Sequence, residues 1–154
     1  MKKFIPLIIG SFLVVGTVGC QDTAKTSADA PNNAGETVAA PKTDDAAQIQ
    51  NDATSEVRRD QLNSDIRARE QRNNASGGDA DRTEGDLQSE VRSKLEANLP
   101  ASQLGVEAED GVVTVSGTVP TEEQLQRVEP LAKEIKGVTS VKVNVQVKPA
   151  KPTN

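Results

Sequence analysis

Apolar and polar positions alternate along two stretches of the chain, at about 104–119 and 139–147. In the second stretch every other residue is valine, from Val141 to Val147. Side chains alternate across a strand, so each stretch predicts strands with one buried face. Asp110-Gly111 divides the first stretch, and this dipeptide between alternating runs is typical of a tight hairpin turn. The pattern therefore predicts strands at about 104–109, 112–119 and 139–147.

Helical spacing replaces the alternation on either side of the hairpin. Before it, leucine or valine recurs at every fourth position from Leu87 to Leu99, which predicts a helix with one apolar stripe that Pro100 ends. After it, Thr121 and Gln124 have the spacing of a capping box and predict a helix start. The apolar face of this second helix comprises Leu125, Val128, Leu131, Ala132 and Ile135.

Proline and glycine mark special backbone positions in this block. Pro130 lies inside the second helix, where it predicts a kink or the start of a second helical piece. Gly137 suits the left-handed end of that helix, and Gly111 allows a positive φ in the hairpin turn. Gly117 within a strand predicts a bulge or a close approach by a helix. We interpret these three glycines as structural.

The elements together predict an α+β fold. Two helices over the strands give a two-layer α/β sandwich in the order αββαβ, with a small three-stranded mixed sheet and both helices on one face. The predicted domain covers residues 84–148. A domain of about 65 residues buries only about 60% of its unfolded surface, so we expect modest stability.

The first residues are typical of an export signal. Lys2 and Lys3 precede an apolar run that is too short to span a bilayer, which fits a signal peptide at 1–19. The run ends in G-T-V-G followed by Cys20, which resembles the lipobox of bacterial lipoproteins. That resemblance implies that Cys20 is lipidated and becomes the mature N-terminus. Two or three acyl chains would then hold the protein on a membrane. The alternative is an incidental thiol after an ordinary cleavage site.

Between the signal and the domain, the composition predicts connecting segments. Residues 20–45 have Val38 as their only large apolar side chain, which predicts a disordered tether. Residues 46–73 lack glycine and proline and carry dense charge, which predicts a solvated helical linker or, alternatively, a partner-binding helix. A flexible linker at 74–83 and a disordered tail at 149–154 complete the organisation. The tether of about 60 residues would reach roughly 40 Å as coil.

Composition narrows the function classes. The chain holds 18 Lys and Arg, 23 Asp and Glu, and no histidine, and loss of the signal would leave a net charge of −7. Both phenylalanines also lie in the signal, so the mature chain would have no aromatic side chain to stack on nucleic-acid bases. Its negative net charge would also repel phosphate backbones. Without histidine or thiolate clusters, we expect neither catalysis nor a metal or other cofactor. The single cysteine rules out a disulfide within one chain.

The order of motifs resembles a known family. The block of helix, strand, Asp110-Gly111, V-T-V-S-G-T-V at 113–119, helix and G-V-T-S-V at 137–141 is similar to a BON domain. The resemblance implies a bacterial envelope domain, associated with phospholipid binding and envelope maintenance under osmotic stress. Many members carry two copies, whereas this chain has one.

Two functional hypotheses follow. In the first, the domain binds membrane phospholipid, although residues 84–148 carry a net charge of −4 and would be repelled by anionic lipid. The candidate contacts for lipid headgroups or a partner are Arg92, Lys94, Lys133, Lys136, Lys142 and Lys148. In the second, the chain is a tethered adaptor for envelope proteins, acting through a sheet edge, a helix face or the 46–73 helix. Gln21 after Cys20 favours the outer over the inner membrane by the usual sorting rule.

Overall fold

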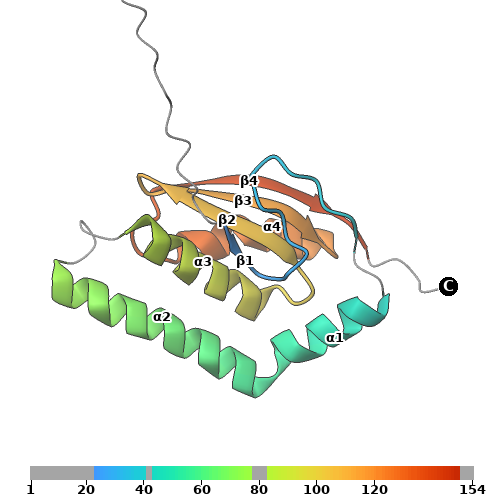
Figure 1. Ribbon diagram of the computed structural model, residues 1–154, viewed down its shortest axis with the longest axis horizontal. Coiled ribbons are helices and arrows are strands. Elements are labelled where there is room, and N and C mark those ends of the chain that lie inside the picture. The colour runs from blue at the N-terminus through green and yellow to red at the C-terminus, as the bar shows by residue number, and fades with distance from the viewer. Residues whose placement is uncertain (1–22, 41–42, 78–82, 150–154) are drawn as a thin grey trace, which may run out of the picture.

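The predicted α+β class is confirmed. The computed structural model describes residues 23–40, 43–77 and 83–149. Helices α3 and α4 lie on one face of a mixed sheet, and α1 and α2 lie outside α3 (Figure 1). The elements are β1 Ala24–Lys25, α1 Thr43–Thr54, α2 Glu56–Ser76, α3 Glu84–Asn98, β2 Gln103–Glu109, β3 Val112–Val119, α4 Glu122–Lys133 and β4 Ser140–Val147. No helix in these ranges is long and apolar enough to cross a membrane.

The hairpin forms where the alternating pattern predicts it. Glu109 lies opposite Val112, so Asp110 and Gly111 are the two loop residues between β2 and β3. Their φ angles are 51° and 78°. Positive φ at both central residues is the signature of the type I′ turn, whose twist matches that of the flanking strands.

Strand β4 runs parallel to β3, and α4 makes the crossover between them. Thr121 caps α4, because its Oγ1 accepts a hydrogen bond from the Gln124 amide at 3.3 Å. The helix passes through Pro130 and ends at Lys133, four residues before Gly137. After Pro130, the amides of Glu134 and Ile135 bond three residues back rather than four. The helix thus ends in a tighter, three-residue hydrogen-bonding pattern, and the expectation that Gly137 marks its end is wrong.

The core between the sheet and the two helices is aliphatic. All four leucine and valine positions of the α3 stripe are buried, which confirms the predicted face. Four of the five predicted apolar positions from α4 onward are also buried, and Leu125 is partly buried. The remaining core comes from the strands: Leu104, Val106, Ala108, Val113, Val115 and Val119.

The sheet has four strands rather than three. β1, Ala24–Lys25, pairs antiparallel with β2 and gives the order β1-β2-β3-β4. The expectation of a disordered tether over 20–45 is therefore wrong at this strand. Two residues without a large apolar side chain leave no trace in a hydropathy pattern. They are held instead by backbone pairing and by hydroxyl groups.

The helix predicted at 46–73 is two helices, α1 and α2. Ser55 separates them and caps α2, since its Oγ accepts from the Arg58 amide at 3.2 Å. The interpretation of this region as a solvated linker is wrong for α2, which packs against α3. Leu62 is 1% exposed and Asn73 is 7% exposed. A single buried leucine makes no periodic stripe, so the pattern gave no sign of this contact.

Candidate functional site

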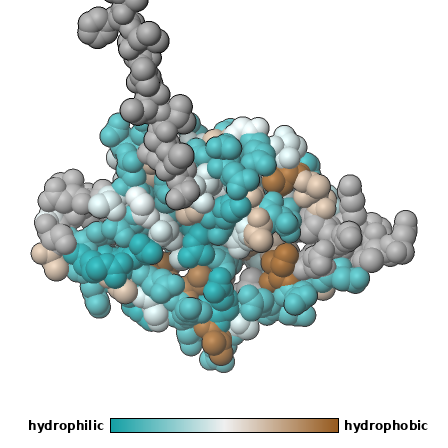
Figure 2. All heavy atoms as spheres, viewed as in Figure 1, coloured by the Kyte–Doolittle hydropathy of each residue, from teal (hydrophilic) through white to brown (hydrophobic). Residues whose placement is uncertain are grey.

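The six predicted contact cations do not form one patch. Arg92 and Lys94 lie on α3, Lys133 and Lys136 lie at and beyond the end of α4, and Lys142 and Lys148 lie on β4 and just after it. The view in Figure 2 shows a mostly hydrophilic surface with small, separated hydrophobic areas. The structure therefore spreads the predicted contacts over several surfaces.

Most of these cations are bonded within the chain. Arg92 contacts Glu96 at 2.5 Å, and Lys94 bridges α3 to α4 through Glu134 at 2.5 Å. Lys133 contacts Glu129 at 2.6 Å, one turn away on the same helix. Each glutamate offsets the positive charge of its partner, which would otherwise attract a headgroup phosphate.

Lys148 and Lys142 stand in different surroundings. Lys148 Nζ donates to the Val38 carbonyl at 2.6 Å and so ties the N-terminal segment to the end of β4. Lys142 is exposed on the outer face of β4, beside a hollow of about 200 Å³ that it lines with Glu107, Glu109 and Asp110. Lys142 therefore faces carboxylates rather than a second cation.

The three predicted structural glycines all have positive φ, at 78°, 126° and 89° for Gly111, Gly117 and Gly137. Gly117 is the most constrained. A Cβ there would overlap the Gln103 backbone carbonyl and would lie 3.1 Å from Pro31 Cδ. The predicted close approach exists, but it is made by the neighbouring strand β2 and not by a helix.

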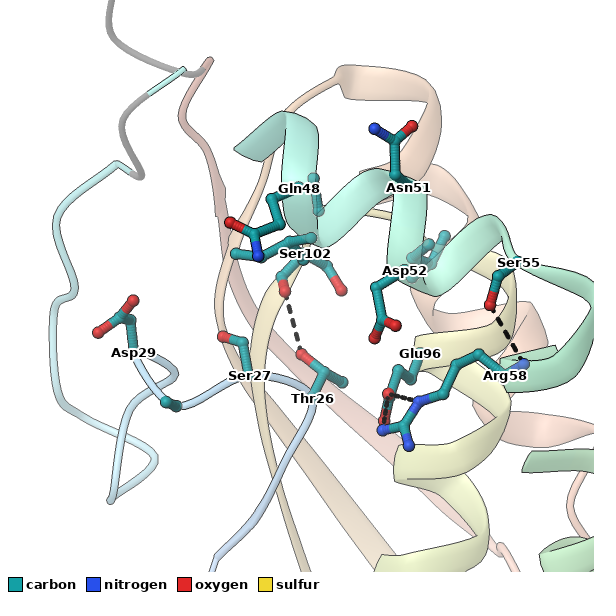
Figure 3. A pocket seen from close by; sticks show the side chains of 14 residues that line it. Thr26, Ser27, Asp29, Gln48, Asn51, Asp52, Ser55, Arg58, Glu96 and Ser102 are labelled. Atoms are coloured by element: carbon teal, nitrogen blue, oxygen red, sulfur yellow. Dashed lines mark hydrogen bonds and ion pairs between the residues drawn. The ribbon is translucent and has the colours of Figure 1, made fainter. Parts of the chain in front are cut away.

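A cavity that the sequence did not reveal lies between α1, the start of α2, the end of α3 and residues 26–29 (Figure 3). Its volume is about 750 Å³. Its lining is mixed, with hydroxyl, amide and carboxylate groups beside a few aliphatic side chains. The lining residues are Thr26, Ser27, Ala28, Asp29, Gln48, Ile49, Asn51, Asp52, Ser55, Arg58, Glu96, Leu99, Ala101 and Ser102.

A charged cluster forms one wall of this cavity. Glu96 accepts from Arg58 through one carboxylate oxygen and from Arg92 through the other. The hydrogen bond to Glu96 raises the pKa of Arg58, and partial burial opposes it only in part. In Figure 3, Gln48 and Asp52 extend from α1 toward this wall and residues 26–27, while Asn51 points away. The Arg58 guanidinium thus ties α2 to α3, whereas Arg92 pairs with Glu96 within α3.

Residues 23–38, which we call the N-terminal strap, lie against β2 and the end of β3 on the outer face of the sheet, opposite α3 and α4. Thr26 anchors it: its amide donates to the Leu104 carbonyl at 2.8 Å, and its Oγ1 accepts from the Leu104 amide at 2.9 Å. Farther along the sheet, the Glu107 carboxylate accepts from Thr23 Oγ1 at 3.0 Å and from the Ala34 amide at 3.1 Å. The Glu107 side chain thus binds the strap at two points.

Gly105 makes room for this cover. A Cβ at Gly105 would lie 2.8 Å from the Pro31 carbonyl oxygen and 2.8 Å from a Thr23 methyl carbon. Pro31 itself is buried. The strap thus packs directly on the β2 backbone, at a position where a side chain would push it away.

A comparison with known protein families finds a match in the C-terminal part of the chain. Residues 83–149 match the family model of the BON domain. These residues form a BON domain. The match confirms the resemblance drawn from the motif order. α3, β2, β3, α4 and β4 all lie inside the BON domain, whereas the strap, α1 and α2 lie outside it.

A curated relative shares part of this region. Osmotically-inducible protein Y of Escherichia coli (strain K12) is 44% identical over 62 residues, which cover 39% of this chain and 31% of that protein. The match therefore spans less than a third of the relative's length. Its name describes a protein induced by osmotic conditions.

Several predicted features lie outside the described residues. These are the signal peptide at 1–19, Cys20 with the neighbouring Gln21, residues 78–82 of the linker and residues 150–154 of the tail. Among the residues that the structure does describe, no group of three or more carboxylate or other metal-binding side chains is placed to hold a metal ion.

Proposed function

We propose that this chain is a non-enzymatic, lipid-anchored protein of the bacterial envelope that supports envelope integrity under osmotic stress. The observation that carries the proposal is a BON domain at 83–149 on a chain whose first twenty residues read as a lipoprotein signal ending at Cys20. The similarity to a protein named as osmotically inducible supports the stress role. Gln21 favours the outer membrane as the place of anchoring.

The anchor, rather than a headgroup-binding patch, would supply membrane attachment. Arg92, Lys94 and Lys133 are each paired with a glutamate of the same domain. The domain is also net acidic, so an anionic bilayer would repel it at long range. We therefore expect the soluble chain without acyl groups to bind anionic vesicles weakly, and the acylated chain to stay with the membrane.

Acyl labelling in cells tests the anchor. Mass spectrometry of the mature protein should find a start at residue 20 with acyl groups on Cys20, and globomycin should block processing. Cys20→Ser removes the acceptor sulfur and should release the protein into the soluble fraction. Detection of an unacylated mature form that begins elsewhere would refute the anchored state.

A growth experiment tests the stress role. Cells that lack this protein should grow more slowly after a hyperosmotic shift, and the wild-type chain should restore growth. Cys20→Ser should fail to restore it if the location matters. Normal growth of the deletion strain through the shift would refute the stress role without bearing on the anchor.

A protein-interaction role is the second candidate, and one feature of the sheet favours it. β4 is the last strand in the order, and its valines are only partly buried. An exposed edge of eight residues can accept an additional strand from a partner.

Crosslinking in cells tests this second role with two single-residue variants. Val145→Pro on β4 should abolish a partner crosslink that uses the edge, because proline disfavours addition of a strand. Val57→Ser on α2, whose side chain is 80% exposed, serves as the control at a distant surface. Loss of the crosslink with Val57→Ser alone would assign partner binding to α2 instead.

A further inference from the structure

Strand β1 lies very close in sequence to the proposed anchor. Ala24 follows Cys20 by four residues, and it pairs with Val106 in the middle of β2. Four residues of extended chain span at most about 14 Å. With β1 paired, the distance between the anchor and the sheet is therefore set by four residues, and not by the whole segment that precedes α1.

The direction of β1 also determines which end of the sheet lies toward the anchor. β1 is antiparallel to β2, so the chain before Ala24 leads toward the Asp110-Gly111 turn. Thr23 Oγ1, bonded to Glu107 at 3.0 Å, lies on that path. The loop at 137–139 joins this turn, because the Thr139 amide donates to the Gly111 carbonyl at 2.8 Å. We call this region the turn end.

The opposite end of the domain is where α4 begins. Gln124 Nε2 donates to the Pro100 carbonyl at 3.1 Å, so the start of α4 lies beside the loop that follows α3. Glu122 is exposed there, and Glu109 is exposed at the turn end. The two glutamates offer matched surface positions at opposite ends of the same sheet.

Specific hydrogen bonds hold the strap in its docked position. Thr26 forms hydrogen bonds with Leu104 through both its amide and its hydroxyl, and its hydroxyl donates to the Ser102 carbonyl at 3.1 Å. Gly105 leaves the space that the Pro31 carbonyl needs. Most of these contacts are hydrogen bonds, and the strap buries no large aliphatic side chain in the core, which is typical of a segment that can open locally without unfolding the domain.

We propose that β1 holds the BON domain close to the bilayer with its turn end toward the headgroups, and that release of the strap leaves the domain attached only through the segment that precedes α1. This inference rests on the proposed anchor at Cys20. The exposed turn end carries Glu109 and Asp110 as well as Lys136 and Lys142. Carboxylates beside ammonium groups suit zwitterionic headgroups, which present both signs of charge, better than a uniformly anionic surface.

The amino-acid composition makes a clean optical test possible. The chain has no tryptophan or tyrosine and a single cysteine. The full mature chain from residue 20 can be coupled through Cys20 to a maleimide lipid in phosphatidylcholine vesicles that also contain dansyl-labelled headgroups. One tryptophan is introduced at a time, as Glu109→Trp or as the matched Glu122→Trp. Energy transfer to the dansyl groups then reports how near each end lies to the bilayer.

We expect higher transfer efficiency from Glu109→Trp than from Glu122→Trp. Adding Thr26→Pro, which removes the Thr26 amide donor and its hydroxyl, should bring the ratio of the two efficiencies to about one, because the released segment before α1 no longer fixes the orientation of the domain. Gly105→Val, which displaces Pro31 by a different route, should do the same. Circular dichroism should show an intact BON domain in at least one of these two release variants.

Equal transfer from the two positions in the chain with an intact strap would overturn the proposal, as would stronger transfer from Glu122→Trp. So would a ratio that neither release variant changes. Chemical coupling at Cys20 makes the result independent of acylation in cells. An unacylated Cys20 in cells would thus refute the proposed anchor, while the vesicle result would still decide whether β1 sets the pose.

Discussion

The inner face of the sheet and the part of the outer face under the strap are equally buried, but they are built from different chemistry. The inner face, under α3 and α4, presents Val106, Val113 and Val115, each 0% exposed. The outer face, under the strap, presents Gln103, Ser116 and Thr118, at 2%, 1% and 3% exposed. Side chains of opposite polarity are thus buried to the same degree on the two sides of the same strands.

The difference shows which interactions stabilise each face. The inner face gains free energy from burial of apolar area, at roughly 25 cal/mol per Å². The outer face is covered through hydrogen bonds that contribute about 1 kcal/mol each. We therefore expect the inner face to unfold only with the whole domain, and the strap to open locally at much lower cost.

The largest expected effect is on the inner face. Val115→Asp would bury an unpaired carboxylate in the aliphatic core, which costs more than about 4 kcal/mol and should unfold a domain of this size. Far-ultraviolet circular dichroism and a thermal melt measure the loss. Val143→Asp, on the partly exposed edge strand β4, is the matched comparison and should cost less. Equal loss in both variants would contradict the graded burial across the sheet.

Gly117→Ala should have the next largest effect. The new Cβ would overlap the Gln103 carbonyl at a φ of 126°, so β2 and β3 must separate locally. We expect a loss of about 3 kcal/mol in the free energy of unfolding, measured by urea denaturation. Gly85→Ala in α3 is the control, because nothing lies within 4 Å of its added Cβ. That control should stabilise the domain by about 0.5–1 kcal/mol.

On the outer face, Thr26→Val should detach the strap and leave the domain folded. The substitution removes the hydroxyl that bonds Ser102 and Leu104, at a cost of about 1–2 kcal/mol to strap docking. Hydrogen exchange should then accelerate at the amides of Thr26 and Leu104, with the α3 amides unchanged. Faster exchange throughout the domain would show that the strap and the core open together.

The smallest effect concerns the contact of α2 with α3. Burial raises the pKa of Asp86, but hydrogen bonds from Thr83 and Arg69 lower it by more, so the carboxyl titrates below its usual range. A pKa that is lower in the folded state stabilises the contact above the unfolded value near 4 and loses that stabilisation as the pH falls.

Because Asp86 is partly exposed, we expect less than about 1 kcal/mol from this carboxyl. Hydrogen exchange along α2, measured from pH 6 to 3, should show the contact weakening at the acid end. Asp86→Asn should remove that part of the pH dependence. An unchanged pH profile in this variant would mean that other carboxyls control the contact.

Much of the BON domain could be predicted because its signals are local. The alternating valines, the Asp110-Gly111 turn and the every-fourth-residue stripe of α3 each depend on a few neighbouring residues. The end of α4 was missed because Gly137 suggested a later end, whereas the last turn already tightens after Lys133. The break at Ser55 was missed because a serine cap within a charged stretch gives no change in hydropathy.

The strap and the cavity could not be predicted for a different reason. They depend on partners that are distant in sequence, such as Thr26 with Leu104 and Arg58 with Glu96. The predicted lipid contacts do not form one patch, because the sequence shows the charge of Arg92, Lys94 and Lys133 but not the glutamates with which they pair in the fold. Polar long-range pairing has no period along the chain, whereas a buried apolar face has one.

The pairing of β1 with β2 also constrains the order of folding. Thr26 and Leu104 are 78 residues apart, so the strap can dock only after β2 has formed. In a chain that emerges N-terminus first, the strap residues appear well before their docking surface. Contacts between such distant segments close large loops and form slowly. The hairpin can assemble at once from neighbouring residues, and the strap is then the last element to be added.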